Sequence, residues 1–546
     1  MLFIRSSKWL LTFLVLWLIA LSSIRDLSIP DEGRYGDISR WMVESGDWLV
    51  PRLNGLPFLH KPPLLHWLSS CLMELLGVHI WVLRLIPVSA AIITLFGLFW
   101  FVKKHVDEKT AQLSVLVLAT SLLFYGSSQY INHDLLVACW ITITILCLAD
   151  FTLSNEKSSL FFGYVACGLG FLSKGLIGIL IPGMVLLPWI LAIGAWRKIL
   201  KLLNPFAILL LFLIVLPWPL MVEHKYSGFL HYFFIEQQFN RFSSSEFNNK
   251  QPWIFYIVCL IVSFLPWLIL TKFKVFSQKS KSILGKPTLI LVIWWAFSCI
   301  VFFSIPPSKL AGYILPATAP LAILIAVMVN QEILSEKAIW VQRWGAIVIL
   351  VPFTVFLLIA PFTHILPEYQ MEGVYNGLIF GLFLLFIVVT LTLLTAKKKI
   401  TALSSTLVVA LSLCVTLTLS VKIFDKKNNA DQMTIKSIVN SSSTLIFYNQ
   451  YYYDVPFLLN TQKPIYIVGD WNNVKDDSTS MQLRDGLHFE PNKKKYLIEE
   501  DQFHSMLISN HKLIVFADKG SLDQHLNKYS KLIHCRNFDV YIFNAI

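Results

Sequence analysis

Two carboxylates and a guanidinium stand together in one short segment. The run DEGRY at residues 31–35 directly follows the first long apolar stretch of the chain. Asp31 or Glu32 could act as a general base or position a substrate, and Arg34 could bind an anion. Ionisable groups beside a membrane are costly unless they pair or serve a function. For this segment alone, an ordinary contact between Asp31 and Arg34 is an equally good interpretation.

A further aspartate and four cations lie near the ends of other apolar stretches. Asp134 begins one such stretch, where capping a helix would explain it as well. Arginine binds phosphate oxygens through two parallel hydrogen bonds, and lysine supplies a compact charge. Each cation alone could instead hold lipid headgroups. The four are Lys61, Lys174, Arg241 and Lys309. Sharing a face with two aspartates, they indicate a pocket for a lipid-linked phosphate.

The elements that position these groups must be membrane helices. Of the 546 residues, 56% are hydrophobic and only 14% charged, and the mean hydropathy is +0.64. This composition excludes a wholly soluble protein. The net charge of +12 would suit a polyanion, but most of the basic residues flank apolar runs, where they orient the chain. No nucleic-acid partner is expected. The cysteine spacing indicates neither disulfides nor a metal site.

The chain is predicted to be a mainly helical, polytopic membrane protein. A helix needs roughly 20 apolar residues to cross the hydrocarbon. Basic clusters flank the predicted spans on one side, which the positive-inside rule makes cytoplasmic. Residues 25–78 and everything after 421 are then outside, with the acids and cations described above. About thirteen spans are predicted, at 8–24, 79–102, 111–127, 134–153, 160–173, 176–195, 205–222, 252–271, 288–304, 310–330, 344–361, 374–395 and 403–421.

The outer loop 25–78 carries two helical patterns. In the first, apolar groups from Ile38 onward share a face behind Asp37, a candidate cap. In the second, Pro62 and Pro63 open a run of leucines, as proline at a first helical turn allows. Both patterns predict helices lying in the membrane interface and bracketing a site at that depth.

The hydropathy falls after residue 421 and the periodicity changes. Short apolar runs predict strands separated by helical stretches. We therefore divide the chain into a transmembrane domain, 1–421, and a small α/β domain outside the bilayer, 422–546. The expected strands are 444–448, 464–468, 513–517 and 540–543.

Three motifs resemble a known family. DEGRY at 31–35, GDWLVP at 46–51 and KPP at 61–63 are similar to the first periplasmic loop of the lipid A aminoarabinose transferases. These enzymes share the GT-C membrane fold with the protein O-mannosyltransferases. The resemblance covers the whole chain, and it implies that Asp31 is a catalytic or positioning aspartate and Asp134 a second essential acid. It implies further that the phosphate of the undecaprenyl carrier is held by Lys61 and Arg241, supported by Arg34, Lys174 and Tyr313.

Two positions depart from the family pattern. His60 precedes Lys61 where relatives often have an acidic residue, and EQQFNR at 236–241 replaces a Glu-His pair ahead of the arginine. The resemblance also implies that a divalent metal ion could bind in this region, with His60 and Glu236 as a ligand pair. A structural or solvent-exposed histidine is the simpler interpretation.

The function implied by the resemblance is transfer of 4-amino-4-deoxy-L-arabinose from undecaprenyl phosphate to lipid A phosphate. The reaction would take place at the periplasmic face of a bacterial inner membrane, among membrane lipids. One alternative is a transferase of another sugar to lipid A, protein or glycan. Another is a lipid or sugar transporter, but transport sites tend to lie near the bilayer midplane between internal repeats. Here the polar residues crowd one surface and the sequence shows no repeat.

Overall fold

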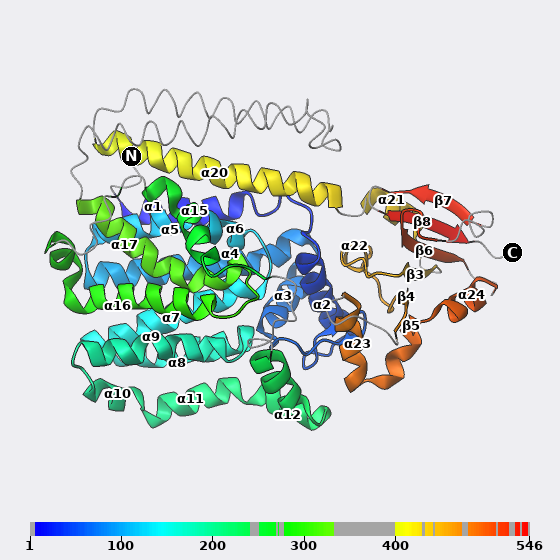
Figure 1. The fold of residues 1–546 in the computed structure, drawn as a ribbon, viewed down its shortest axis with the longest axis horizontal. Coiled ribbons are helices and arrows are strands. Elements are labelled where there is room, and N and C mark those ends of the chain that lie inside the picture. The colour runs from blue at the N-terminus through cyan, green and yellow to red at the C-terminus, as the bar shows by residue number, and fades with distance from the viewer. Residues whose placement is uncertain are drawn as a thin grey trace.

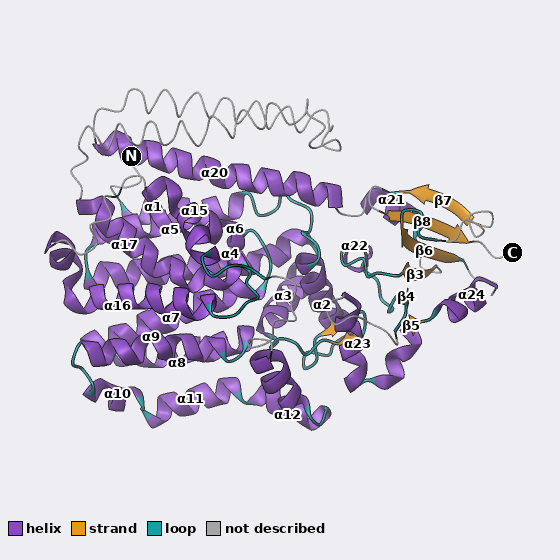
Figure 2. Cartoon of the chain, in the orientation of Figure 1, coloured by secondary structure: helices purple, strands orange, loops and turns teal. Residues whose placement is uncertain are grey.

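The computed structural model describes most of the chain, as a body of helices with a β-sheet at one end (Figures 1 and 2). The predicted spans 344–361 and 374–395, as well as Arg241, lie outside the described residues. The described residues are 6–240, 250–268, 271, 278–331, 399–428, 432–440, 443–471, 479–508, 512–522, 530–535 and 538–543.

The apolar segments of the sequence form helices that lie alongside one another (Figure 1). Within the described ranges, five helical segments are long and apolar enough to cross a membrane, and α5 and α6, bent by 67°, could form a sixth span. The number thirteen stays a prediction. The elements of this body are α1 (Ser7–Ala20), α4 (Ile80–His105), α5 (Glu108–Ala119), α6 (Leu122–Ser128), α7 (His133–Ser154), α8 (Lys157–Lys174), α9 (Ile177–Ala192), α10 (Arg197–Leu202), α11 (Pro205–Val215), α12 (Pro217–Lys225), α13 (Phe229–His231), the π-helix η2 (Tyr232–Asn240), α15 (Phe255–Leu268), α16 (Gln278–Ser304), the 3-10 helix η3 (Ala311–Ala317), α17 (Thr318–Gln331) and α20 (Lys399–Asn428).

Basic residues gather at one end of this helical body. Lys103 pairs with Glu108 at 3.1 Å, and Lys104 pairs with Asp150 at 2.7 Å. Lys198 on α10 contacts the residue that follows α7. In Figure 1, α10 and the start of α20 lie at this same end, away from the sheet. Basic residues that flank different apolar runs in the sequence therefore meet at one end of the body.

Residues 25–78 form two helices and a hairpin at the other end of the body. Helix α2 (Asp31–Ser45) carries Asp31 and Glu32 in its first turn, where carboxylates favour the helix dipole, and ends at Gly46 with φ 66°. Our expectation that Asp37 caps this helix is wrong, because the helix begins at Asp31. Helix α3 (Leu64–Leu76) begins after two prolines, as predicted. The hairpin of β1 (Arg52–Leu53) and β2 (Leu56–Pro57) lies between them and was not predicted.

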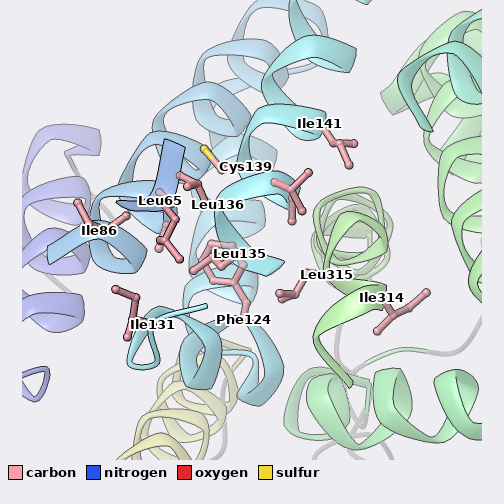
Figure 3. Packing of buried hydrophobic residues seen from close by; sticks show 14 of the residues in the cluster. Leu65, Ile86, Phe124, Ile131, Leu135, Leu136, Cys139, Ile141, Ile314 and Leu315 are labelled. Carbon is pink, nitrogen blue, oxygen red and sulfur yellow. The ribbon is translucent and has the colours of Figure 1, made fainter. Parts of the chain in front are cut away.

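Apolar side chains from distant segments meet where the helices converge. Leu65 on α3, Phe124 on α6 and Leu135 on α7 belong to one buried cluster (Figure 3). Ile314 and Leu315 on η3 extend the same cluster. Small residues bring α8 and α9 together, since a Cβ added to Gly178 would lie 2.3 Å from the carbonyl carbon of Gly170. This packing fixes the ends of α3, α7, α8 and η3, which carry the polar residues.

The sheet follows α20 in the sequence and has six strands in the order β5-β4-β3-β6-β8-β7. β3 pairs in parallel with β4 and β6, and β8 runs antiparallel to β6 and β7. All four predicted strands form, whereas β5 and β7 were missed because their sequences are short or polar. The predicted domain boundary at 421/422 falls inside α20 and stays a prediction. The elements are α21 (Gln432–Ile438), β3 (Thr444–Tyr448), α22 (Val455–Leu459), β4 (Tyr466–Val468), α23 (Thr479–Phe489), the 3-10 helix η4 (Pro491–Tyr496), β5 (Leu497–Ile498), α24 (Glu500–Ile508), β6 (Leu513–Asp518), β7 (Ser530–His534) and β8 (Phe538–Phe543).

The segments around the sheet pack directly on α2 and the hairpin. A Cβ on Gly33 would lie 2.8 Å from the backbone of Tyr453, so glycine is needed for this close approach. Asn54 in the hairpin turn exchanges hydrogen bonds of 2.9 and 2.8 Å with the backbone of Ile465. The C-terminal segment is thus held against the part of the chain that carries DEGRY.

Candidate active site

Glu32 is the centre of a buried charge network. Its carboxylate accepts hydrogen bonds from Arg84 Nε at 3.0 Å and Nη2 at 2.8 Å, and Arg25 Nη2 lies 3.7 Å away. The backbone N–H of Ile131 also donates to it, at 3.1 Å. Burial by itself raises the pKa of Glu32, but the two arginines hold it below its ordinary value. Arg25 continues the network to Asp425 at 2.5 Å. With its oxygens bonded within the protein, Glu32 holds the loops together.

Asp31 and Arg34 point away from this network and pair with each other across one helical turn. The Asp31 side chain is 27% exposed, whereas Glu32 is fully buried. Arg34 also donates to Gln482 on α23 at 2.8 Å, and its guanidinium lies 5.8 Å from the ring centre of Tyr453. Its Nε is buried without a hydrogen-bond partner among the described residues. Burial by itself would lower the pKa of Arg34, but its neighbours raise the pKa by a larger amount. The guanidinium therefore stays charged.

Asp134 forms a second charged centre with Lys174. Asn132, and not Asp134, caps α7, since the Asn132 side chain accepts from the Asp134 N–H at 2.9 Å. The Asp134 carboxylate is therefore available to the Lys174 ammonium, with which it forms an ion pair. Lys174 Nζ lies 4.0 Å from the ring centre of Tyr313. A Cβ on Gly312 would lie 2.3 Å from Asp134 Oδ2, so the carboxylate packs against the backbone of η3.

Three aromatic side chains connect the two charged centres. The Tyr35 ring meets the His133 ring edge-on at 4.9 Å between centres, and the His66 and His133 rings are 5.6 Å apart. Both histidines are at most 2% exposed. Lys61, which precedes α3, lies close enough to His133 for its charge to act on the imidazole. DEGRY, Lys61, Asp134 and Lys174 therefore form one neighbourhood, built by four separate segments.

The two candidate metal ligands have separate partners. His60 Nε2 lies 3.4 Å from Asp485 Oδ2 and 3.4 Å from the Tyr232 hydroxyl, between the hairpin and α23. Glu236 lies 3.6 Å from His231 Nδ1, and both are largely exposed. In the part of the chain that the structure describes, no group of three or more His, Cys, Asp or Glu side chains could hold a metal ion. The metal site stays a prediction.

Lys309 differs from the other predicted cations. Its side chain is buried and donates to the backbone carbonyl of Gln251 at 3.0 Å. This bond and the adjacent bridge between Lys250 and Ser308 join two loops. A structural role thus accounts for Lys309, although its phosphate role remains untested. Arg241 lies outside the described residues, so its position relative to Lys61 is a prediction.

Some residues that we missed have a recognisable signal in the sequence. Arg84 interrupts the apolar run of α4, and a buried charge in a membrane segment calls for a partner. His133 is the neighbour of Asp134 in the chain, yet nothing local pairs it with His66. Gln482 and Asp485 carry no signal, because α23 approaches Arg34 and His60 only in the folded chain.

The site as a whole combines carboxylates, fixed cations and buried imidazoles. The carboxylates and imidazoles could orient a polar substrate, and the cations could meet a developing anionic charge.

The sequence is similar to those of several known proteins. A family model described as dolichyl-phosphate-mannose-protein mannosyltransferase matches residues 60–221. An undecaprenyl phosphate-alpha-4-amino-4-deoxy-L-arabinose arabinosyl transferase from Enterobacter sp. (strain 638) is 32% identical over 362 residues, 64% of each chain. The protein of the same name from Pseudomonas aeruginosa (strain UCBPP-PA14) is 28% identical over 393 residues, 70% of each chain.

A solved structure extends the similarity over nearly the whole chain. The crystal structure of ArnT from Cupriavidus metallidurans bound to undecaprenyl phosphate has a TM-score of 0.82 and 21% identity, covering 98% of this chain and 97% of that one. This likeness shows the fold, a mainly helical GT-C membrane fold. The alignment with the Enterobacter relative spans 64% of that relative's length. The resemblance of this chain to the aminoarabinose transferases is confirmed.

Proposed function

We propose that this chain is a membrane glycosyltransferase that moves 4-amino-4-deoxy-L-arabinose from undecaprenyl phosphate to lipid A phosphate. The observation that carries the proposal is the neighbourhood of Asp31, Asp134, Lys61 and Lys174 at one end of the helical body. The similarity to transferases named for this donor supports the choice of sugar and carrier.

The cations of the site suit the departing carrier. A glycosyl phosphate is already activated, because the carrier can leave as a phosphate when its developing charge is met. Arg34 provides positive charge within DEGRY, Lys61 provides it near His133, and Lys174 provides it beside Asp134. Arg241 completes the set in our proposal. Direct displacement by the acceptor oxygen would invert the configuration at the anomeric carbon.

The carboxylates act on the acceptor and the sugar. A lipid A phosphate is already an anion, so it needs orientation and charge balance more than a general base. We assign Asp31 and Asp134 to positioning the acceptor or the amino group of the donor sugar. A hydroxyl acceptor would instead require one of them, with Asp31 as the candidate, to accept its proton.

The proposal includes the placement of the chain in a bacterial inner membrane. Thirteen spans would put the basic end of the body in the cytoplasm and put DEGRY, Asp134 and the sheet in the periplasm. The basic residues gathered at that end support this orientation. In that orientation the C-terminal segment, through Gln482 and Tyr453, borders the site from the periplasmic side.

A second candidate is transfer of another sugar to lipid A, protein or glycan, which the match to the mannosyltransferase family model favours. Mass spectrometry of lipid A from cells with and without the gene separates the two. A mass difference of one pentosamine supports our proposal, and a hexose or hexosamine difference supports the second candidate. An unchanged lipid A would contradict lipid A as the acceptor.

The proposed mechanism is tested by turnover of purified Asp31→Asn protein with undecaprenyl-phosphate aminoarabinose and lipid A. We expect transfer to fall by about 10²-fold or more, the scale expected when a reacting group is no longer held in position. Glu44→Gln, an exposed carboxylate on the same helix, is the matched control and should transfer normally. Near-normal transfer by Asp31→Asn would remove this residue from the mechanism, and no transfer by the native protein would overturn the function itself.

A further inference from the structure

The buried histidine pair holds two ring nitrogens that lack hydrogen-bond partners. His66 lies on α3 and His133 at the start of α7, and their ring centres are 5.6 Å apart. Both imidazoles are buried, and in both the Nε2 atom finds no hydrogen-bond partner among the described residues. Buried polar groups in proteins are nearly always hydrogen-bonded, so two unpaired nitrogens on neighbouring rings require an explanation.

The hydrogen bonds of Ser39 determine which nitrogen of His66 carries the proton. Ser39 Oγ lies 2.8 Å from the Tyr35 carbonyl, to which its hydroxyl must donate because a carbonyl only accepts. The same oxygen lies 3.1 Å from His66 Nδ1. Since the hydroxyl proton is already used, Nδ1 must be the donor of that bond. The Nε2 atom of neutral His66 is therefore a bare lone pair.

A backbone carbonyl fixes His133 in the same form. His133 Nδ1 lies 2.8 Å from the Ser173 carbonyl oxygen, which can only accept. The proton is again on Nδ1, and Nε2 is again a bare acceptor. Burial lowers the pKa of His66 to about 3, which agrees with a neutral ring. The pair thus presents two acceptors and no donor.

The chemistry of this pair selects its ligand. A phosphate oxygen is itself an acceptor and would be repelled by two lone pairs. A metal cation would meet the charges of Lys61 and Lys174, both of which act on His133. A hydroxyl or amino group can donate a hydrogen bond to a neutral imidazole without either penalty. The cations next to the pair already provide for a phosphate.

We propose that His66 and His133 form a binding site for hydroxyl or amino groups of the sugar that is transferred. This inference rests on the proposed function and adds to it a pair of positioning residues that hold the sugar while the cations hold its phosphate. A site that accepts a hydrogen bond from a sugar hydroxyl discriminates against a sugar without that hydroxyl, because the acceptors of the site are then left unpaired. The pair would therefore contribute to the choice of sugar.

Asparagine and glutamine separate this role from a structural one. Asparagine reproduces the Nδ1 position, so His66→Asn and His133→Asn keep the bonds to Ser39 and Ser173 but lose the Nε2 acceptor. Glutamine reproduces the Nε2 position, so His66→Gln and His133→Gln keep an acceptor there but lose the Nδ1 bonds. We expect the asparagine variants to raise KM for undecaprenyl-phosphate aminoarabinose at least tenfold and the glutamine variants to raise it less.

Binding measurements provide a second readout. Undecaprenyl phosphate and its aminoarabinose conjugate should both raise the unfolding temperature of the native protein, the conjugate more. The asparagine variants should keep the shift caused by undecaprenyl phosphate and lose the extra shift caused by the sugar. Two results would overturn the inference while the native protein still transfers sugar. The asparagine variants could show an unchanged KM and an unchanged extra rise in unfolding temperature, or the glutamine variants could raise KM more than the asparagine variants do. Failure of the native protein to transfer would instead count against the proposed function.

Discussion

Glu32 on α2 and Arg84 on α4 form a fully buried ion pair, joined by two hydrogen bonds of 3.0 and 2.8 Å. This pair explains why the adjacent carboxylates Glu32 and Asp31 have different surroundings. Glu32 is buried in the body, and its oxygens accept hydrogen bonds from other parts of the chain. Asp31 is partly exposed and pairs with Arg34. The segment DEGRY thus combines a structural acid with an acid that is available for chemistry.

Replacing Glu32 should damage folding more than catalysis. In Glu32→Gln, Arg84 would remain buried without its carboxylate, while Arg25 keeps Asp425, and breaking a buried pair in this way typically costs about 3–5 kcal/mol. We expect a clear fall in the unfolding temperature and in the yield of protein from the membrane. Asp31→Asn, one residue away, should unfold like the native protein. Equal stability of the two variants would contradict the division of roles.

Replacing Lys174 should slow transfer. Lys174→Met leaves Asp134 without its cation and removes a charge next to Tyr313. We expect kcat to fall by about 10²-fold, as for other groups that stabilise developing charge. Lys198→Met, at the opposite end of the helical body, should transfer normally. If both variants had the same kcat, the charge of Lys174 would have no part in the reaction.

A single methyl group at Gly312 should displace Asp134. The new Cβ would lie 2.3 Å from Asp134 Oδ2, so the carboxylate would have to move away from Lys174. We expect Gly312→Ala to lower transfer at least tenfold. Gly183→Ala on α9 is the control, since nothing lies within 4 Å of its added Cβ. Full activity of Gly312→Ala would show that the position of Asp134 is not critical.

Acid should destabilise the protein through His66. The pKa of His66 is lowered by burial to about 3 from an ordinary value of 6.5, so between these values the unfolded chain binds a proton that the folded chain does not. Stability is therefore complete above pH 6.5 and is lost as the pH falls toward 3. At pH 5 the loss is about 2 kcal/mol. Unfolding at pH 7 and pH 5 should show a loss of that size that is absent from His66→Asn.

The contact between the hairpin and the C-terminal segment should weaken when Glu490 is neutralised. Glu490 bonds to Arg52 at 2.9 Å through both oxygens and accepts from the Tyr226 hydroxyl. Burial raises the pKa of Glu490, but Arg52 holds it below its ordinary 4.5, so the contact is complete above pH 4.5 and is lost in stronger acid. Glu490→Gln should weaken it at pH 7 by about 1–3 kcal/mol.

Hydrogen exchange of residues 479–498 would measure that change. We expect faster exchange there in Glu490→Gln, with the helices of the body unaffected. Glu499→Gln, an exposed carboxylate in the same C-terminal segment, serves as the control. Equal exchange in both variants would show that Glu490 does not hold the segment in place.

Local patterns in the sequence are sufficient for much of the fold. Long apolar runs predict the membrane helices, two prolines predict the start of α3, and short apolar runs predict four strands of the sheet. The start of α2 was missed because Asp37 looks like a cap in the sequence. In the folded chain Asp37 lies inside the helix, buried, with Arg40 at 2.7 Å. Burial of a charge cannot be read from the residues beside it.

The partners of the charged groups were decided only by the tertiary structure. The sequence by itself identified Asp31, Asp134 and the outer cations as residues that could do chemistry. It could not distinguish Asp31 from Glu32, or bring His66 to His133, because these distinctions depend on segments far apart in the chain. A helix forms from the periodicity of its own residues, whereas an ion pair or a bare imidazole nitrogen depends on which other helix packs against it.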